Sequence, residues 1–286
     1  MNNFDEQYIS LLKDILKNGT KKEDRTGVGT ISSFGKTMEI DISESFPLLT
    51  LRKIVPKIFL EETLFFLGGS SDTKVLENKG IKIWTGNTSR EFLDQRGLHH
   101  LPEGDMGLGY GPQWRSFGQG DPIERAVDQV SQVLQGLRDD PYSRRHVITA
   151  WNPLALPKVA LPPCHITYQF VVNGDKLDCC FYMRSNDVYL GLPFNIAQYA
   201  MLTYIFAKSC NRKPGKLVYF CADAHIYTNA IEASETLLDK KPFESPLMVI
   251  TVPLEKVSDV FKLTSDDFQI DNYQNHGNGP KVTMAI

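Results

Sequence analysis

The 286 residues are 42% hydrophobic, 23% charged and 10% aromatic, which suffices for a sizeable core and excludes a disordered chain. The 31 Lys and Arg against 34 Asp and Glu give a net charge of −3, and without a basic stripe this disfavours nucleic-acid binding. No apolar run would span a membrane or form a signal-peptide core, and five cysteines without metal-ligand spacing predict a cytoplasmic, metal-free protein.

The first half of the chain mixes helical and strand patterns. Apolar side chains recur at helical spacing in three segments, which are residues 5–18, 56–67 and 123–137. The first helix should end near Gly19, and the second is interrupted by Glu61 and Glu62. Residues 29–42 alternate in the manner of strands. Residues 91–103 are polar and contain glycine, which predicts a loop or lid.

The second half predicts a buried sheet and a buried helix. Residues 146–151 predict a buried strand, while 165–172 and 176–184 predict two strands joined by a turn at 173–175. Residues 194–209 are almost wholly apolar, which predicts a central helix. Because no repeat or long linker divides the chain, we expect one α+β domain over residues 1–286, built around a large sheet.

Cys164 is the strongest candidate for a reactive group. Pro162 and Pro163 fix the backbone before it, and His165 follows it directly. Close to arginines, such a thiol would have a lowered pKa and act as a Michael nucleophile. A lone cysteine is more often a buried structural residue, but the other polar motifs of this chain favour the nucleophile.

Several side chains suit a nucleotide monophosphate. Arg25 and Arg184 are bidentate donors of the kind that a phosphate needs, whereas the adjacent Arg144 and Arg145 fit either a phosphate site or a solvated surface. Asn195 stands in an apolar run, where its amide requires a hydrogen-bond partner such as a base edge.

A carboxylate and a polar pair complete the set. Glu62 lies in an apolar segment and is either a helix-surface group or a buried proton-handling group with a raised pKa. His225 and Tyr227 are two residues apart on one strand face, which suits a ribose hydroxyl or a polar pair in the core. Together with Cys164, these groups predict covalent chemistry on a pyrimidine nucleotide.

Long motifs resemble the thymidylate synthase family over nearly the whole chain. They comprise residues 24–30, 82–84, 89–94, 110–115 and 150–153, the Cys164 and Arg184 segments, and the tail 284–286. The resemblance implies a thymidylate-synthase-like fold, in which a large mixed sheet carries helices and the sheets pack across a homodimer interface. It also implies one-carbon transfer from 5,10-methylenetetrahydrofolate to C5 of dUMP.

The resemblance assigns a role to each matching position. Cys164 would attack C6 of uracil, with further catalytic roles for Glu62, Tyr110, His165, Asn195 and Asp187. Asn195 would read O4 and N3 of uracil, and His225 with Tyr227 would bind the 3′-hydroxyl. The 5′-phosphate would be held by Arg25, Arg184 and Ser185, and by Arg144 and Arg145 of the partner subunit. The folate would be covered by Ile83, Trp84, Asp187, Leu190, Gly191, Phe194, Tyr227 and the tail residues Met284, Ala285 and Ile286.

The chain departs from the family pattern around the pyrimidine. Met183 replaces a glutamine, and residues 183–187 are similar to the deoxycytidylate hydroxymethylase branch. We expect this change to remove an amide next to the base. Further departures lie at residues 50–53, Phe65, Phe66, Ala222 and Ala230.

These departures create a fork in the expected product. A hydride from tetrahydrofolate gives dTMP, whereas water gives 5-hydroxymethyl-dUMP. The altered residues, with Asn195 kept, favour a uracil-specific hydroxymethylase of the sort found in viruses that replace thymine, which would act in the host cytoplasm. Trp84 and the intact tail support the alternative, a thymidylate synthase.

Two other hypotheses are weaker. A Cys-His hydrolase would use Cys164 and His165, but sequence neighbours seldom give the geometry of a thiol protease. A catalytically silent homologue would have no reason to keep Cys164, Glu62, Tyr110 and Asn195 together.

Overall fold

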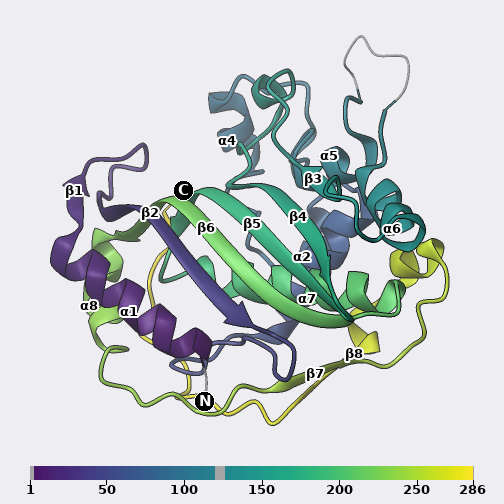
Figure 1. Ribbon diagram of the computed structural model, residues 1–286. Coiled ribbons are helices and arrows are strands. Elements are labelled where there is room, and N and C mark those ends of the chain that lie inside the picture. Colours follow the sequence, from purple (N-terminus) through teal and green to yellow (C-terminus); the bar gives the residue numbers. More distant parts are fainter. Residues whose placement is uncertain (1–2, 120–125, 286) are drawn as a thin grey trace.

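A six-stranded mixed sheet forms the centre of the protein in the computed structural model, which describes residues 3–119 and 126–285 (Figure 1). In spatial order, its strands are β1 (Thr20–Lys22), β2 (Thr30–Asp41), β6 (Lys213–Tyr227), β5 (Lys176–Asp187), β4 (His165–Asn173) and β3 (Val147–Thr149). Neighbouring strands are antiparallel except β5 and β6, which are parallel. This confirms the predicted large mixed sheet. A two-stranded sheet joins β7 (Leu247–Ile250) to β8 (Phe268–Asp271).

Helices surround the sheet and cover one of its faces. The α-helices are α1 (Asn3–Asn18), α2 (Pro56–Gly68), α3 (Lys74–Glu77), α4 (Arg90–Gln95), α5 (Tyr110–Ser116), α6 (Gln129–Asp139), α7 (Leu192–Ser209) and α8 (Ile231–Glu235). Single 3-10 turns span Leu156–Lys158, Thr228–Ala230, Val257–Lys262 and Ser265–Asp267. In Figure 1, α2 and α7 lie behind the sheet, and α7 packs on β5 and β6. No helix in the described part of the chain has the length and apolar character that crossing a membrane requires.

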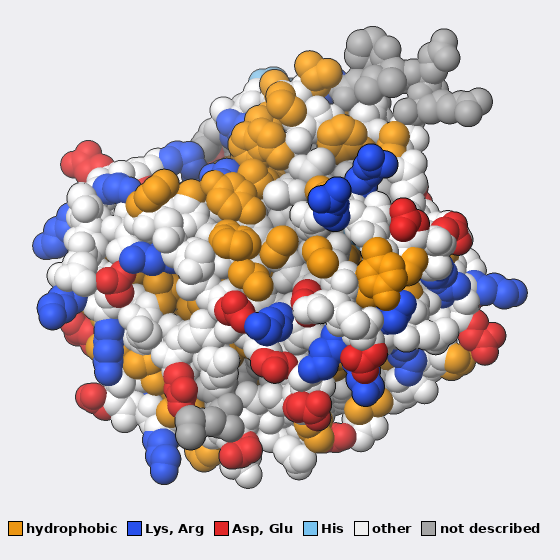
Figure 2. Space-filling view, viewed as in Figure 1, with side chains coloured by type: hydrophobic (Ala, Val, Ile, Leu, Met, Phe, Trp, Pro, Cys, Tyr) orange, Lys and Arg blue, Asp and Glu red, His pale blue; other side chains and the backbone are white. Residues whose placement is uncertain are grey.

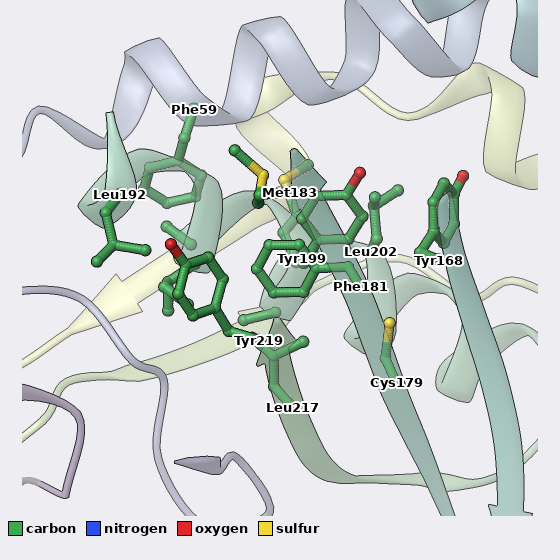
Figure 3. Packing of buried hydrophobic residues seen from close by; sticks show 14 of the residues in the cluster. Phe59, Tyr168, Cys179, Phe181, Met183, Leu192, Tyr199, Leu202, Leu217 and Tyr219 are labelled. Atoms are coloured by element: carbon green, nitrogen blue, oxygen red, sulfur yellow. The ribbon is translucent and has the colours of Figure 1, made fainter. Parts of the chain in front are cut away.

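The core lies between the sheet and helices α2 and α7. Alternate residues of β5 turn inward, so Cys179, Phe181 and Met183 are buried. They meet α7, where the ring of Tyr199 stacks on Phe181 with a centroid distance of 4.0 Å (Figure 3). Helix α7 is apolar on nearly all sides because the core surrounds it.

The strand directions gather distant segments at one end of the sheet. Because β5 and β6 are parallel, Asp187 and His225 lie opposite each other where both strands end. Strand β4 runs antiparallel to β5, so its first residue, His165, pairs with Met183 near that same end. Cys164, which immediately precedes β4, is therefore brought close to Arg184 of β5.

Most predicted elements are confirmed to within a few residues, but three differ. The predicted loop at 91–103 contains α4, which begins after Ser89 because the Ser89 hydroxyl accepts from the N–H of Phe92. The predicted helix 123–137 begins only at Gln129, after the cap provided by Asp128, and residues 123–125 lie outside the described residues. The strand predicted at 146–151 shortens to β3 at the sheet edge, so Val147 is exposed and not buried.

Candidate active site

Cys164 sits in a turn that three neighbouring groups hold in place. Its N–H donates to the Tyr110 hydroxyl at 2.7 Å, and its carbonyl accepts from the Arg184 N–H at 2.9 Å. The Arg184 side chain donates to the carbonyls of Pro162 and Pro163, each at 2.8 Å. Its Nη2 also lies 3.6 Å from the Cys164 Sγ. The Pro-Pro-Cys turn is thus fixed, with its thiol beside a guanidinium.

The protonation state of Cys164 differs from the predicted one. Burial raises the pKa of the thiol, because a thiolate loses solvation there, and the charges of Arg184 and Arg25 offset this only in part. The thiol therefore keeps its proton at neutral pH, and the proton must leave when sulfur forms a bond.

His165 belongs to the buried aromatic cluster. Its Nδ1 lies 2.7 Å from the Tyr199 hydroxyl, and its ring stacks on Tyr110 with centroids 4.1 Å apart. Burial lowers the pKa of His165 to about 3, so the imidazole is neutral. An imidazole held in this way gives no support to a Cys-His hydrolase.

Glu62 joins α2 to α7 through a chain of hydrogen bonds. Its Oε1 accepts from Trp84 Nε1 and its Oε2 from Gln198 Nε2, both at 2.7 Å. The Gln198 Oε1 in turn accepts from Asn195 Nδ2 at 3.3 Å. Burial raises the pKa of Glu62 to about 7 although both hydrogen bonds oppose the shift, which confirms the raised pKa expected for a buried carboxyl. Such a group can take or give a proton near neutrality.

Gln198 is a site residue that the sequence did not reveal. It lies one turn after Asn195 on α7 and is only 3% exposed. The available signal was an amide side chain within a run of apolar residues, because a buried amide needs hydrogen-bond partners.

The ends of β5 and β6 contribute further polar groups. Asp187 accepts from the N–H groups of Tyr189 and Leu190, both at 3.0 Å, and so shapes the turn into α7. The His225 Nδ1 lies 3.1 Å from Asp223 Oδ1, and the His225 ring meets Tyr227 edge-on at 5.0 Å. Burial raises the pKa of Tyr227 to about 12, so its hydroxyl is neutral.

Arg25 is placed beside the same site. It is exposed in a turn that Asp24 organises by accepting from the N–H groups of Thr26 and Gly29 at 2.9 and 2.8 Å. Its positive charge acts on Cys164, where it partly opposes the rise in pKa that burial causes. Ser185 lies opposite Asp223 at the end of the β5–β6 pair.

Arg144 and Arg145 lie elsewhere on the same chain. Both are exposed, and the Arg144 carbonyl accepts from Gln169 Nε2 at 3.1 Å. Gln169 is four residues along β4 from His165, a distance of about 13 Å in a strand. One chain therefore does not bring this arginine pair to Cys164.

Half-buried apolar side chains are neighbours in sequence of Trp84 and Gly191. Ile83, Leu190 and Phe194 pack against the core with part of their surface still exposed, next to Trp84 and Gly191. The tail is fixed nearby, because Asn229 Nδ2 donates to the Thr283 carbonyl at 3.0 Å and Tyr189 to Pro280 at 3.1 Å. Ala285 is half-buried, and Ile286 lies outside the described residues. Within the described ranges, no His, Cys, Asp and Glu side chains form a group that could hold a metal ion.

Met183 is a buried residue of β5. Its side chain is 1% exposed and points into the core, between the strand positions of His165 and Cys221 (Figure 3). It lies opposite His165 of β4 and adds an apolar side chain to the surroundings of that residue. Ala230 is buried as well.

Comparison with known proteins identifies the family. A family model described as "Thymidylate synthase" matches residues 6–286. The chain belongs to the thymidylate synthase family. It is 44% identical to the thymidylate synthase of Homo sapiens over 98% of this chain and 90% of that protein. The thymidylate synthase of equine herpesvirus 2 is 41% identical, over 99% of this chain and 98% of its own length.

Longer members of the thymidylate synthase family match as well. The bifunctional dihydrofolate reductase-thymidylate synthase of Paramecium tetraurelia is 45% identical over 99% of this chain. The chain spans 61% of that protein and 54% of the bifunctional relative from Zea mays.

Proposed function

We propose that the protein is a thymidylate synthase, which transfers a one-carbon unit from 5,10-methylenetetrahydrofolate to C5 of dUMP and releases dTMP. The observation that carries the proposal is the hydrogen-bonded bridge from Trp84 through Glu62 and Gln198 to Asn195. The relatives at 41–45% identity, all named for thymidylate synthase, favour this product over the hydroxymethyl one.

The nucleotide would span the end of the sheet. Arg184 and Arg25, with Ser185, would bind the 5′-phosphate, since fixed guanidinium groups suit a phosphate monoester. His225 and Tyr227 at the end of β6 would meet the 3′-hydroxyl. Asn195 would face O4 and N3–H of uracil and place C6 next to the thiol.

The reaction begins at Cys164. Its sulfur forms a bond to C6 while the thiol proton passes to a water molecule, and the π electrons of C5=C6 move toward O4 to give an enolate. Arg184, 3.6 Å from the sulfur, stabilises the thiolate character that develops. Glu62, whose pKa is about 7, together with the neutral His165, exchanges protons on the pyrimidine side through water. Tyr110 keeps the Cys164 turn in position through its hydroxyl and would assist removal of the C5 proton.

The lining of the site fits a flat folate ring. Ile83, Leu190 and Phe194 leave apolar surface exposed, and Trp84 is fixed through its indole N–H. Asp187 adds a buried carboxyl whose pKa burial raises, beside Gly191 and Tyr227. The folate supplies the one-carbon unit and a hydride. Trp84 and the anchored tail would exclude the water that competes with that hydride.

A homodimer would complete the phosphate site. The uncovered face of the sheet carries Cys180, Tyr182, Val218 and Phe220 in paired positions, and Phe220 is 40% exposed. Figure 2 shows hydrophobic side chains gathered on the side of the molecule where Figure 1 shows the open sheet. An apolar sheet face of this kind is typical of a protein interface. Packing two sheets together would let Arg144 and Arg145 reach the site of the partner.

A product assay tests the proposal. The purified protein is incubated with dUMP and methylenetetrahydrofolate, while mass spectrometry follows the nucleotide and absorbance follows dihydrofolate. We expect one dTMP and one dihydrofolate per turnover. A Cys164→Ala variant, which lacks the nucleophile, serves as the negative control and should form neither. A nucleotide one oxygen heavier than dTMP, with tetrahydrofolate left unoxidised, would instead establish the hydroxymethylase. No turnover of dUMP or dCMP would favour a silent homologue.

A further inference from the structure

We infer that Gln198 is a positioning residue that fixes the orientation of the Asn195 amide and thereby makes the site prefer uracil over cytosine. The inference rests on the proposed function, because it takes Asn195 to face the base. It concerns a side chain whose hydrogen bonds run to Glu62 and Asn195.

The direction of the hydrogen-bond chain is set at Trp84. An indole N–H only donates, so Glu62 Oε1 must accept from it. In its ionised form, which prevails above its pKa of about 7, Glu62 accepts at both oxygens, and Oε2 then requires a donor from Gln198. The amide nitrogen of Gln198 must face Glu62, which leaves its carbonyl oxygen pointing to Asn195.

The same logic fixes the next amide. The Gln198 oxygen accepts from Asn195 Nδ2 at 3.3 Å. If the Asn195 amide turned over, its oxygen would face the oxygen of Gln198, and two acceptors would meet without a proton between them. Gln198 is 3% exposed, so water has little room to relieve that clash. A buried acceptor without a donor is costly, and the orientation is held.

The held orientation matches one pyrimidine. With one Nδ2 hydrogen directed to Gln198, the other is available for a carbonyl, and Asn195 Oδ1 is available for an N–H donor. Uracil offers O4 as acceptor and N3–H as donor. Cytosine offers the reverse pattern, an amino donor at position 4 and an acceptor at N3. Cytosine would need the amide turned over, against the bond to Gln198.

The test compares nucleotide binding by wild type and Gln198→Leu, using full-length protein and calorimetric titration with dUMP and with dCMP. Leucine approximates the volume of glutamine but makes no hydrogen bond. We expect the preference for dUMP over dCMP to fall roughly tenfold, since one oriented hydrogen bond is lost. A double-mutant cycle adds the decisive readout. In an Asn195→Ala background, Gln198→Leu should leave the preference unchanged, because no amide remains to be oriented.

Thr203→Val is the matched control. Thr203 is equally buried on α7, and its hydroxyl donates to the Tyr199 carbonyl at 2.7 Å and also bonds the Cys179 side chain. This variant should keep the wild-type preference. If Gln198→Leu fails to fold, Gln198→Met replaces it with a more flexible side chain of similar size.

Each outcome decides the inference. An unchanged dUMP preference in Gln198→Leu, or an equal loss for both nucleotides, overturns it, because Gln198 would then act through Glu62 or through packing alone. A wild type that binds dUMP preferentially but forms no dTMP would defeat the proposed function while leaving the orienting role of Gln198 measurable. A wild type without any preference for dUMP would defeat the inference.

Discussion

At the scale of single residues, burial determines which groups of the site carry charge. It raises the pKa of Cys164, raises that of Glu62 to about 7 and lowers that of His165 to about 3. Two of these three groups are therefore neutral at neutral pH, and Glu62 is poised between its two forms. The site holds a guanidinium next to a protonated thiol, so sulfur reactivity depends on where the thiol proton goes.

The raised pKa of Glu62 has a consequence for stability. Between its ordinary pKa of 4.5 and about 7, the folded protein holds a proton there that the unfolded chain has released. Stability must therefore decrease as pH rises through this window. Glu62→Gln lacks the ionisation, so its stability relative to wild type should increase by about 2–3 kcal/mol between pH 4.5 and pH 8.

Urea denaturation at both pH values measures the difference. Glu232→Gln, an exposed substitution on α8, is the control and should follow wild type at each pH. A stability difference between Glu62→Gln and wild type that stays constant with pH would show that Glu62 does not titrate as burial requires.

At the scale of elements, sequence patterns predicted the features that depend on neighbouring residues, such as turns and buried helices. The hairpin of β4 and β5 turns at Gly174, whose φ of 63° suits glycine, and the apolar run of α7 predicted its burial. The contacts that build the site are not local. Gln198 and Glu62 are 136 residues apart, so no periodicity in either helix indicates their bond. The thiol pKa was misjudged for a related reason, because the sequence shows nearby arginines but not the depth of burial.

A buried carboxylate is one of the groups that attach helix α1 to the rest of the protein. Asp5 is 0% exposed and accepts from the Thr50 N–H at 3.0 Å and from the Thr50 hydroxyl. Asp5→Ala removes the acceptor and leaves both donors buried. We expect a loss of about 2–4 kcal/mol in the free energy of unfolding.

The neighbouring Glu6→Ala is a suitable control, because Glu6 is exposed on the same turn of α1 and should change stability by less than about 0.5 kcal/mol. Chemical denaturation of both variants gives the comparison. Equal midpoints for Asp5→Ala and wild type would mean that the bonds between Asp5 and Thr50 add nothing to the stability of the fold.

At the scale of the whole molecule, the proposed dimer would explain both the open face of the sheet and the position of Arg144 and Arg145 away from Cys164. Tyr182 and Phe220 face outward in register, and Arg144 is anchored beside the same sheet through Gln169. A second copy on this face would bury the apolar side chains and offer its arginine pair to a phosphate site that holds Arg25 and Arg184. Each active site of the proposed dimer would then combine residues of two chains.

Subunit mixing tests this arrangement directly. Cys164→Ser lacks the nucleophile, and the double variant Arg144→Ala/Arg145→Ala lacks the donated pair, so each homodimer should be nearly inactive. After joint unfolding and refolding, half of the dimers are hybrids, and each hybrid holds one site with an intact Cys164 and intact arginines. We expect the mixture to recover about one quarter of wild-type dTMP formation. A mixture of Cys164→Ser with Cys164→Ala should recover nothing. If native mass spectrometry detects the hybrids and activity is still absent, Arg144 and Arg145 act in the site of their own chain. In that arrangement, no site of a hybrid has both an intact Cys164 and intact arginines.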